Sequence, residues 1–553
     1  MRKYIKTTDI LLVLISLFYL WGCSSGTDNR PVTDSMTVKT SIAISDAEDN
    51  PAVVESTGTI RLEFSKPLNT NTVNGSIELY RVKASGDLEI VPCRTESTEN
   101  QVLLIKADGR KFKEGEEYKL LVKKGILSTD GLTLASDFTG FFATNHSFSL
   151  DNTPLTGLTD SRAAIVCISD LHMGDDRSFT LRYGWLRNNR SLLTGFLNKI
   201  RLSPNVKELV IAGDLFDEWV APMDVEPLNG MTLSGFVDSI AASNQDIIDA
   251  FNKIIQDGLI KVTYVPGNHD MLVTSEDIAR IFPGISQARD ARGLGTYAPR
   301  QEIIIEHGHR YDFYNAPDPY SNRDIAGTDS LLPPGFFVSK IAATSDMEKI
   351  GSSIKTAAAT LDTANQSQHN YFLYWVAWEA ILSQRPVKES WNAKIIKTGI
   401  DGYSSLYAIN DLIPYDSGCG KLDVNLYKGI QDTWDERQQT NLVPAPIPAA
   451  EAIAAGALDI ILDAQALQQY ILIPSSNKRI VVFGHTHQTI LVPYPAYKAV
   501  YVNTGTWIDS VKPPATFAVI IPPQNDSATG HITTYQYLID GNLKKLDEAV
   551  ITY

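Results

Sequence analysis

The chain has 553 residues, of which 43% are hydrophobic and 20% are charged, a composition typical of globular domains. At about 150 residues per domain, this length predicts about two to four domains. The formal net charge of −15 argues against DNA or RNA as a main partner, because phosphate backbones bind to basic faces. A small anionic substrate stays possible, since bound metal ions can supply positive charge locally.

Residues 1–22 have the pattern of a signal peptide: a basic start, MRKYIK, precedes the apolar run ILLVLISLFYLW, which is short for a membrane span. The tetrapeptide LWGC then ends at Cys23. It resembles the lipobox of bacterial lipoproteins, although Trp21 departs from the small residue usual there. The resemblance implies that Cys23 is lipidated and that the exported chain is anchored to the cell envelope, at the outer membrane or the periplasmic face. The alternative is a plain signal peptide or an uncleaved anchor.

Residues 23–37 are predicted to form a polar tether, and residues 38–150 an all-β domain. Short alternating segments such as TIRLEFS, SIELYRV and EYKLLVKKGI are separated by Asn, Gly, Pro and Lys, as in a β-sandwich. The stretches FSKPLNTNTVNGSIELY and FTGFFAT resemble bacterial Ig-like domains. The resemblance implies a spacer or binding module, and the lone His146 is interpreted as structural or solvated.

The cysteines predict no disulfide framework, because Cys93, Cys167 and Cys419 are widely spaced. Cys167 lies inside the apolar run AAIVCIS, which predicts a buried free thiol.

From residue 160 to residue 553, apolar strands alternate with amphipathic segments, which predicts an α/β domain. Between about 320 and 475 the strand signal fades and helical patterns such as DMEKIGSSIKTAAATLDTANQ, NYFLYWVAWEAIL and AAEAIAAGALDIILDAQALQQYIL take over. This part is predicted to be a helical cap inserted into the domain. The expected strands are AAIVCIS, ELVIAG, KVTYVPG, EIIIEHG, RIVVFGHTH, AVYVNTG and TFAVII.

Polar side chains follow five of these strands. Because ligands gather at the carboxyl ends of strands in open α/β sheets, we expect the five ends to converge on one site. Six of the nine histidines lie there, which unrelated loops would not produce. The side chains in question are Asp170 and His172, Asp214, Asn268, His269 and Asp270, His307 and His309, and His485 and His487.

The types of side chain indicate the kind of site. Imidazole, carboxylate and amide ligands suit Mn, Fe or Zn, and no set of thiolates competes with them. Two divalent ions about 3.5–4 Å apart need a bridging carboxylate, and Asp214 is placed to be one. No Ser or Cys with a partnered base stands out, so attack by metal-bound water is expected instead of a covalent intermediate.

The ordered motifs D-x-H, G-D-x-x-D, G-N-H-D, H-G-H and G-H-T-H resemble those of the calcineurin-like metallophosphoesterase superfamily. The resemblance covers about 160–320 and 475–553. It implies a β-sandwich flanked by helices and two bound divalent ions. One ion would take Asp170, His172, Asp214 and His487, and the other would take Asp214, Asn268, His307 and His485.

The resemblance also assigns the catalytic residues. His269 would contact the phosphoryl group and stabilise or protonate the leaving oxygen, and Asp270 would orient His269. His307 and His309 could both bind metal; the family pattern favours His307, before the glycine. Arg177, Arg310 and His309 are further candidates for contact with the substrate, although surface arginines are the simpler interpretation.

The function predicted on these grounds is an exported binuclear phosphoesterase. It would hydrolyse a small phosphomonoester or phosphodiester by attack of a metal-bridging hydroxide. One alternative is a hydrolase like the UDP-diacylglucosamine pyrophosphatases, which GHTHQ and YVNTGTW resemble. Another is a surface binding protein that has lost its activity. The sequence leaves the substrate, the native metals and the oligomeric state open.

Overall fold

The computed structural model describes residues 35–40, 44, 51–54, 59–83, 87–107, 112–113, 116–144, 162–352, 368–417, 422–456, 462–523 and 529–552. The signal peptide, Cys23, His146 and Cys419 lie outside the described residues. The chain divides into two compact units, the first up to residue 46 with 58–111 and 118–140, and the second 47–57, 112–117 and 141–553.

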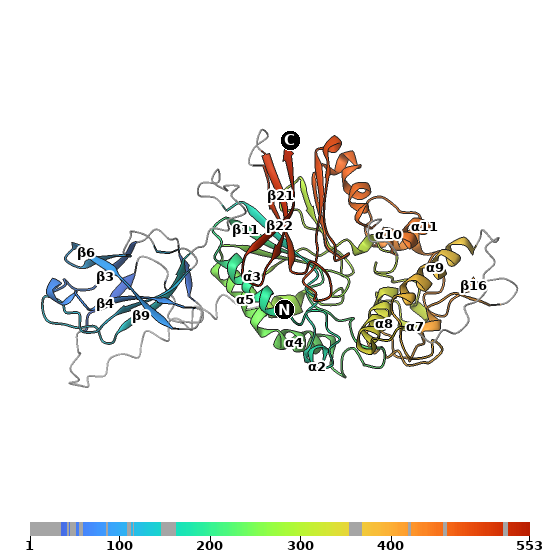
Figure 1. Ribbon diagram of the computed structural model, residues 1–553, viewed down its shortest axis with the longest axis horizontal. Coiled ribbons are helices and arrows are strands. Elements are labelled where there is room, and N and C mark those ends of the chain that lie inside the picture. The colour runs from blue at the N-terminus through green and yellow to red at the C-terminus, as the bar shows by residue number, and fades with distance from the viewer. Residues whose placement is uncertain are drawn as a thin grey trace, which may run out of the picture. The chain divides into compact units, whose positions relative to one another are not determined.

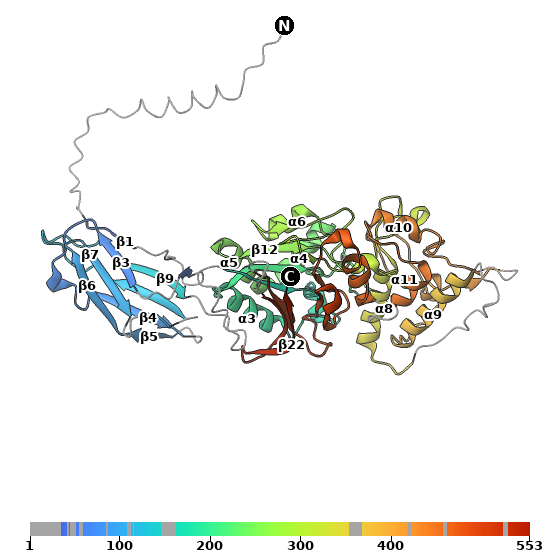
Figure 2. The same cartoon turned by 90° about the horizontal axis from the view of Figure 1, so that it is seen from above.

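The first unit is built from β-strands, as the alternating sequence predicts. In β3, Ile60, Leu62 and Phe64 are buried while Thr59 and Glu63 are exposed. One sheet has the order β1 (Val38–Thr40), β3 (Thr59–Phe64), β7 (Val102–Ala107) and β6 (Cys93–Glu99). The other has the order β9 (Phe138–Thr144), β8 (Glu117–Val122), β4 (Ile77–Val82) and β5 (Leu88–Val91), and a 3₁₀ turn η1 (Thr70–Thr72) precedes β4. Figure 2 shows these strands in blue. A further short strand, β2 (Ala52–Val54), pairs in parallel with the last residues of β9.

The second unit contains a seven-stranded sheet in which the first strands are parallel. The strands β10, β11, β12 and β13 run in the same direction, and β20, β21 and β22 continue the sheet with antiparallel pairing. The order is β13 (Ser286–Gln287), β12 (Lys261–Val265), β11 (Val206–Ala212), β10 (Ala164–Ile168), β20 (Thr516–Ile521), β21 (Thr529–Tyr537) and β22 (Leu543–Thr552).

A second, four-stranded sheet packs against the first. Its strands β14, β17 and β19 are parallel, and β18 pairs antiparallel with β19. Ile480 and Val482 from this sheet share a hydrophobic cluster with Ile165 and Val210 from the first sheet. The two sheets therefore form a sandwich. The order is β14 (Ile303–Ile305), β17 (Ile480–Phe483), β19 (Ala499–Thr504) and β18 (Thr489–Tyr494).

The alternation of side chains explains why these strands are apolar throughout. In β10, Ile165 and Cys167 face the cluster between the sheets, whereas Val166 and Ile168 face the cluster under the helices. Both faces are covered, so every residue of the strand is buried. Cys167 is a buried free thiol, as predicted.

Helices cover the outer face of the seven-stranded sheet. Apolar residues of α3, α4 and α5 belong to the same cluster as Val166 and Leu209, and Figure 1 shows these helices in green beside the sheet. The helix α5 ends at Gly258 with φ of 66°, in the left-handed region that favours glycine. The helices are α2 (Asp176–Thr180), α3 (Arg190–Arg201), α4 (Leu233–Ser243), α5 (Gln245–Asp257) and α6 (Ser275–Ile281).

In the described residues between β14 and β17, helices alternate with long irregular connections, and the two short strands β15 and β16 pair with each other. Its helices α9 and α11 pack against each other (Figure 2). The elements are η3 (His309–Tyr311), α7 (Arg323–Ala326), α8 (Pro334–Glu348), α9 (His369–Ser383), η5 (Ile409–Asp411), β15 (Tyr415–Asp416), β16 (Leu422–Asp423), α10 (Trp434–Thr440), α11 (Ala449–Ala455), η6 (Leu467–Ile471) and η7 (Pro474–Ser476). A last turn, η8 (Pro495–Tyr497), follows β18.

The structure also departs from the predicted elements. All seven predicted strands are present, but β13, β18, β21 and β22 were not predicted. The strands β13, β18 and β22 lie at the edges of their sheets, and polar residues interrupt the apolar ones in β21, TGHITTYQY. A helix was predicted over 346–366; the helix there is α8, which begins earlier and ends at Glu348, and 353–367 lie outside the described residues. Within the described ranges, no helix is both long and apolar enough to cross a membrane.

Candidate metal centre

Five strand ends bring the predicted polar residues together. Residues after β10, β11 and β12 of one sheet meet residues after β14 and β17 of the other, since both parallel sets present their carboxyl ends at the same edge. Almost all of these side chains are buried, and His487, at 18% exposed, is the most accessible of the histidines. The convergence that the sequence predicts is therefore present.

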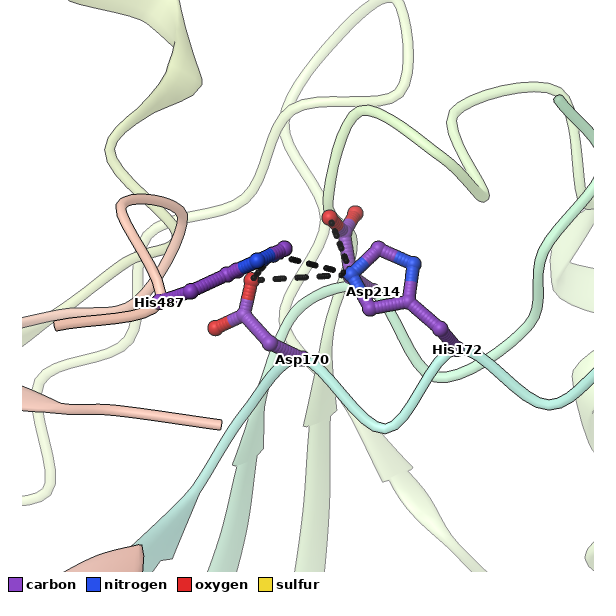
Figure 3. A group of neighbouring side chains, drawn as sticks. All are labelled: Asp170, His172, Asp214 and His487. Atoms are coloured by element: carbon purple, nitrogen blue, oxygen red, sulfur yellow. Dashed lines mark hydrogen bonds and ion pairs between the residues drawn. The ribbon is translucent and has the colours of Figure 1, made fainter. Parts of the chain in front are cut away.

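Four of the residues form a compact group, which Figure 3 shows: Asp170, His172, Asp214 and His487. One potential ligand atom from each lies within 4.8 Å of those of the other three. Nε2 of His172 is 3.1 Å from Nε2 of His487, and Nε2 of His487 is 3.1 Å from Oδ1 of Asp170. Two imidazole nitrogens and two carboxylates that point at one another suit a divalent ion such as Zn²⁺, Mn²⁺ or Fe²⁺.

Asp214 connects this group to a second set of residues. Its Oδ2 lies 3.5 Å from Nε2 of His172 and 3.2 Å from Nε2 of His307. Nε2 of His307 is also 3.0 Å from Oδ1 of Asn268. Asp214 thus stands between the two sets of residues.

His485 completes the second set. Its ring centroid is 5.1 Å from that of His307. Nε2 of His485 is 3.0 Å from Oδ2 of the buried Asp312, a residue that sequence reasoning left without a role. A carboxylate on one ring nitrogen fixes the ring and leaves the other nitrogen, Nδ1, to a ligand.

The backbone at the centre is unusual. Five of the seven candidate ligands have positive φ: Asp170 at 54°, His172 at 50°, Asp214 at 53°, His485 at 72° and His487 at 60°. For residues other than glycine this region costs about 1–3 kcal/mol each, and such residues cluster at functional sites. The strands end in turns that direct these side chains to one point, at the expense of local backbone strain.

Two glycines allow the loops to approach closely. A Cβ on Gly484, inside the GHTH motif, would lie 2.6 Å from Oδ2 of Asp170. A Cβ on Gly267, inside the GNHD motif, would lie 2.1 Å from Oδ1 of Asp214. Any larger residue would displace a candidate ligand.

His269 lies beside the first group, and its orienting carboxylate is Asp217. Nδ1 of His269 is 3.0 Å from Oδ1 of Asp217, and Nδ1 of His172 is 3.3 Å from the other oxygen of Asp217. The sequence predicted that Asp270 would orient His269. Instead, Asp270 accepts hydrogen bonds from the backbone amides of Gly267 and Leu215, so it holds two of the loops together.

The charges of the cluster depend on one another. Burial alone would raise the pKa of Asp170, but His487 and His307 hold it below its usual range. Burial would lower the pKa of His172 and of His307, but Asp170 and Asp217 raise that of His172 to about 10, and Asp214 and Asp170 raise that of His307 to about 9. The buried carboxylates are therefore charged only when cations lie beside them. Protonated histidines are such cations, and divalent ions could take the place of their protons, so the residues fit a metal centre.

A cavity of about 510 Å³ opens onto the cluster. His269, Asn268, Asp214, His485 and His487 line it from the sheet side. The inserted segment lines it from the other side, with Gly335, Val338 and Ser339 of α8, Ile381 of α9, and Gln384, Arg385 and Gly456. Tyr374, Ala377 and Trp378 of the aromatic segment NYFLYWVAWEA are buried, and residues that follow the segment line the cavity.

The side chains that the sequence offers as substrate contacts, Arg177, Arg310 and His309, do not line this cavity. Arg177 is held by Asp175 at 2.7 Å and by the carbonyls of Glu226 and Pro227. Arg310 is buried between Glu306 at 2.8 Å and Asp290 at 2.9 Å. These arginines are structural, because carboxylates and carbonyls already satisfy their donors.

His309 is buried as well, next to His307, with their ring centroids 5.3 Å apart. Within the described part of the chain, neither of its ring nitrogens has a hydrogen-bond partner. Burial, with His307 and His485 nearby, holds its pKa well below the usual range. The ring of His307, not that of His309, points between Asp214 and Asn268, which agrees with the choice of His307.

Residues of the segment YVNTGTW, in and after β19, contact the loops that carry candidate ligands. Asn503 donates to the carbonyl of Gly484 at 2.7 Å and to Oγ1 of Thr486 at 3.0 Å. The backbone amide of Trp507 donates to the carbonyl of Asp170. Asp463, from the inserted segment, accepts from Asn503 and from Tyr501, and no feature of the sequence pointed to it.

A comparison with models of known protein families finds one match in this region. Residues 163–351 match the model of the calcineurin-like phosphoesterases. The phosphoesterase match contains Asp170, Asp214, Asn268 and His307, whereas His485 and His487 lie beyond it. It also runs past residue 320, where the sequence predicts the insertion to begin. The family match and the buried cluster together support a metal-dependent hydrolase of phosphate esters and the binding of divalent metal.

Similar solved structures include purple acid phosphatase PPD1 from yellow lupin (Lupinus luteus) seeds, at 10% identity, 91% of this chain, 73% of that chain and a TM-score of 0.26. The copper resistance protein PcoC of Escherichia coli matches at 13% identity over 20% of this chain and 99% of its own, with a TM-score of 0.16. The N-terminal part of the bacterial S-layer protein SbsC matches at 14% identity over 26% of this chain and 29% of its own, also with a TM-score of 0.16. All three TM-scores are too low to indicate a shared overall fold. No curated protein matches the chain.

Proposed function

We propose that the chain is an exported phosphoesterase with two divalent metal ions, which hydrolyses a small phosphomonoester or phosphodiester. The observation that carries the proposal is the convergence of seven candidate ligands from five strand ends into one cluster beside a cavity of about 510 Å³. A binding protein that had lost its activity would be expected to lack some of these ligands, and every expected position is filled.

The proposed ligand sets follow the geometry. Asp170, His172, Asp214 and His487 would hold one ion, and Asp214, Asn268, His307 and His485 the other. Divalent ions in such a site neutralise the charge of a phosphate ester and lower the pKa of bound water.

The remaining chemistry belongs to side chains of the chain. Asp217 accepts from Nδ1 of His269, which leaves Nε2 as the ring nitrogen that can act on a substrate. The indole of Trp219 lies 4.7 Å from the ring of His269 and limits its rotation. A protonated His269 could thus hold a proton at Nε2 and transfer it to the leaving oxygen, which would otherwise depart as an alkoxide.

The test uses the purified full-length chain. We expect it to contain about two transition-metal ions and to hydrolyse an aryl phosphate or an aryl phosphodiester when Mn²⁺ is supplied, and to lose this activity in EDTA. Asp214→Asn should reduce the rate at least about 100-fold, because it removes the residue shared by both ligand sets.

Asp547→Asn, which changes an exposed carboxylate on β22, is the matched control and should leave the rate unchanged. A folded protein that binds metal but hydrolyses neither class of ester would contradict the proposal. Release of a nucleoside monophosphate from a nucleotide-linked lipid would instead favour the pyrophosphatase alternative.

Export and anchoring belong to the same proposal. They are supported by the basic start, the apolar run and the LWGC motif, all of which lie outside the described residues. The first unit would then be a spacer or binding module, of Ig-like type, between the membrane and the phosphoesterase.

A further inference from the structure

A second cavity, of about 920 Å³, adjoins the proposed active site. The indole of Trp185 lines both cavities. Its ring centroid lies 4.8 Å from that of His172, 5.3 Å from that of His269 and 5.8 Å from that of His487. Trp185 therefore forms the wall between the metal cluster and the second cavity.

Positive charge predominates in the second cavity. Four cationic side chains line it, Arg182, Arg187, Arg190 and Lys349, against the two carboxylates of Asp346 and Asp509. The whole chain has a net charge of −15, so the sign of the charge in this cavity is opposite to that of the chain. A concave surface with one sign of charge raises the local concentration of ligands of the opposite sign.

Two of these cations are already engaged. Arg190 pairs with Asp246 at 2.7 Å and lies over the ring of Phe179 at 4.8 Å. Arg187 donates to the carbonyl of Arg182 at 3.0 Å. These contacts hold both side chains in place in the lining of the second cavity.

The other two cations, Arg182 and Lys349, are exposed, and the described part of the chain offers neither side chain an ion pair. Both carboxylates in the lining have other partners. Asp509 accepts hydrogen bonds from the backbone amides of Asn188 and Asn189. Asp346 lies 4.0 Å from Arg385, a residue of the active-site cavity. Arg182 and Lys349 are thus the charges in this cavity that a ligand can use.

Building on the proposed phosphoesterase function, we infer that this cavity is a subsite for a second anionic group of the substrate. The reacting phosphoryl group would lie at the metal cluster. The alcohol part would pass over Trp185, and its own phosphate or carboxylate would contact Arg182 and Lys349. The substrate class is then a phosphate ester whose alcohol part is itself anionic.

The test compares ethanediol, butanediol and hexanediol bisphosphates with the matching alkyl monophosphates, by release of inorganic phosphate from the full-length chain. We expect the KM of the best-fitting bisphosphate to be about tenfold lower than that of its monophosphate, as two charge-assisted contacts in a partly exposed site would give. The variant Arg182→Asn/Lys349→Asn should remove this preference and leave the kinetics of the monophosphate unchanged. Asn is chosen because φ is 65° at Arg182 and 52° at Lys349, and Asn tolerates this region.

Lys207→Asn/Lys544→Asn is the matched control, since it removes two exposed cations from β11 and β22. A second measurement does not need turnover: calorimetric titration of butanediol bisphosphate into the chain in EDTA should show weaker binding by the Arg182/Lys349 variant than by the control. If the wild type hydrolyses both kinds of ester without preference, or if the preference persists in the variant, the proposed anion subsite is contradicted. The proposed phosphoesterase function is then still supported. If nothing is hydrolysed, the proposed function fails, and the titration alone decides whether the anion subsite exists.

Discussion

Asp217 illustrates, at the scale of single residues, what the structure adds to the motifs. In the motif GDLFDEW, Asp217 follows the candidate ligand Asp214, and the sequence alone does not distinguish a partner of the metal ligands from a solvated carboxylate. It is buried, and its two oxygens lie near Nδ1 of His172 and Nδ1 of His269. Backbone amides of Trp219 and Val220 donate to the same carboxylate and fix it in place. One carboxylate therefore orients both a proposed ligand and the proposed proton donor.

Replacement of Asp217 by Asn tests this role. An amide cannot accept from both histidines as the carboxylate does, so we expect kcat for an aryl phosphate to fall roughly 10- to 100-fold, with a smaller change in KM. Asp238→Asn, an exposed position on α4, is the control. A kcat within twofold of the wild type would show that the carboxylate of Asp217 has no role in orienting the two histidines.

At the scale of elements, the inserted helix α8 carries an unusual side chain. Lys340 is buried, and its Nζ donates to the carbonyls of Val225 at 2.9 Å and Ala221 at 3.3 Å. Burial lowers its pKa from 10.5 to about 7, against the weaker opposing effect of Asp224. The same helix lines the active-site cavity, so Lys340 couples the insertion to the loop after β11.

The pKa of Lys340 predicts how stability depends on pH. Between about pH 7 and 10.5 the unfolded chain keeps the proton that the folded chain has lost, so the free energy of unfolding rises with pH across this window. The wild type should therefore gain stability relative to Lys340→Met between neutral pH and about pH 10. The midpoint of thermal unfolding measures this difference. The exposed Lys397→Met should show no such trend, and a parallel pH dependence of wild type and Lys340→Met would contradict the prediction.

At the scale of the whole molecule, the chain combines a β-rich unit with a unit that matches the calcineurin-like phosphoesterases over residues 163–351. Under the proposed function and export, the enzyme would act on small phosphate esters outside the cytoplasm. The second cavity is lined mainly by cationic side chains although the whole chain has a net charge of −15, so an anionic substrate would be attracted to this side of the cluster.

Replacement of Cys23 by Ala tests the anchor. In the native host, the wild type should be found in the membrane fraction of the cell envelope and should incorporate radiolabelled fatty acid, whereas Cys23→Ala should do neither. Cys93→Ala, within the β-rich unit, is the control for loss of a thiol. If the wild type and Cys23→Ala both fractionate with the membrane and neither incorporates radiolabelled fatty acid, an uncleaved anchor is favoured over lipidation.

The sequence by itself determined the apolar strands, the change from all-β to α/β organisation, and the residues at the strand ends. These are local properties: burial of both faces makes β10 and β17 apolar throughout, and a site at the edge of a sheet must draw its ligands from residues after strands. The strands β21 and β22 escaped prediction for different reasons: β22, at the edge of its sheet, is largely exposed, whereas β21 is mostly buried but contains many polar residues, so both carry a weak apolar pattern.

Only the tertiary structure decided how these residues are paired. Asp217 rather than Asp270 contacts His269, Asp312 holds His485, and Asp463 supports the GHTH loop, over separations of 52, 173 and 40 residues along the chain for the three contacts with His269, His485 and Asn503. Arg177 and Arg310 turned out to be structural for the same reason. A side chain's partners depend on which distant segments fold beside it, and neither its type nor its neighbours in the sequence specify them.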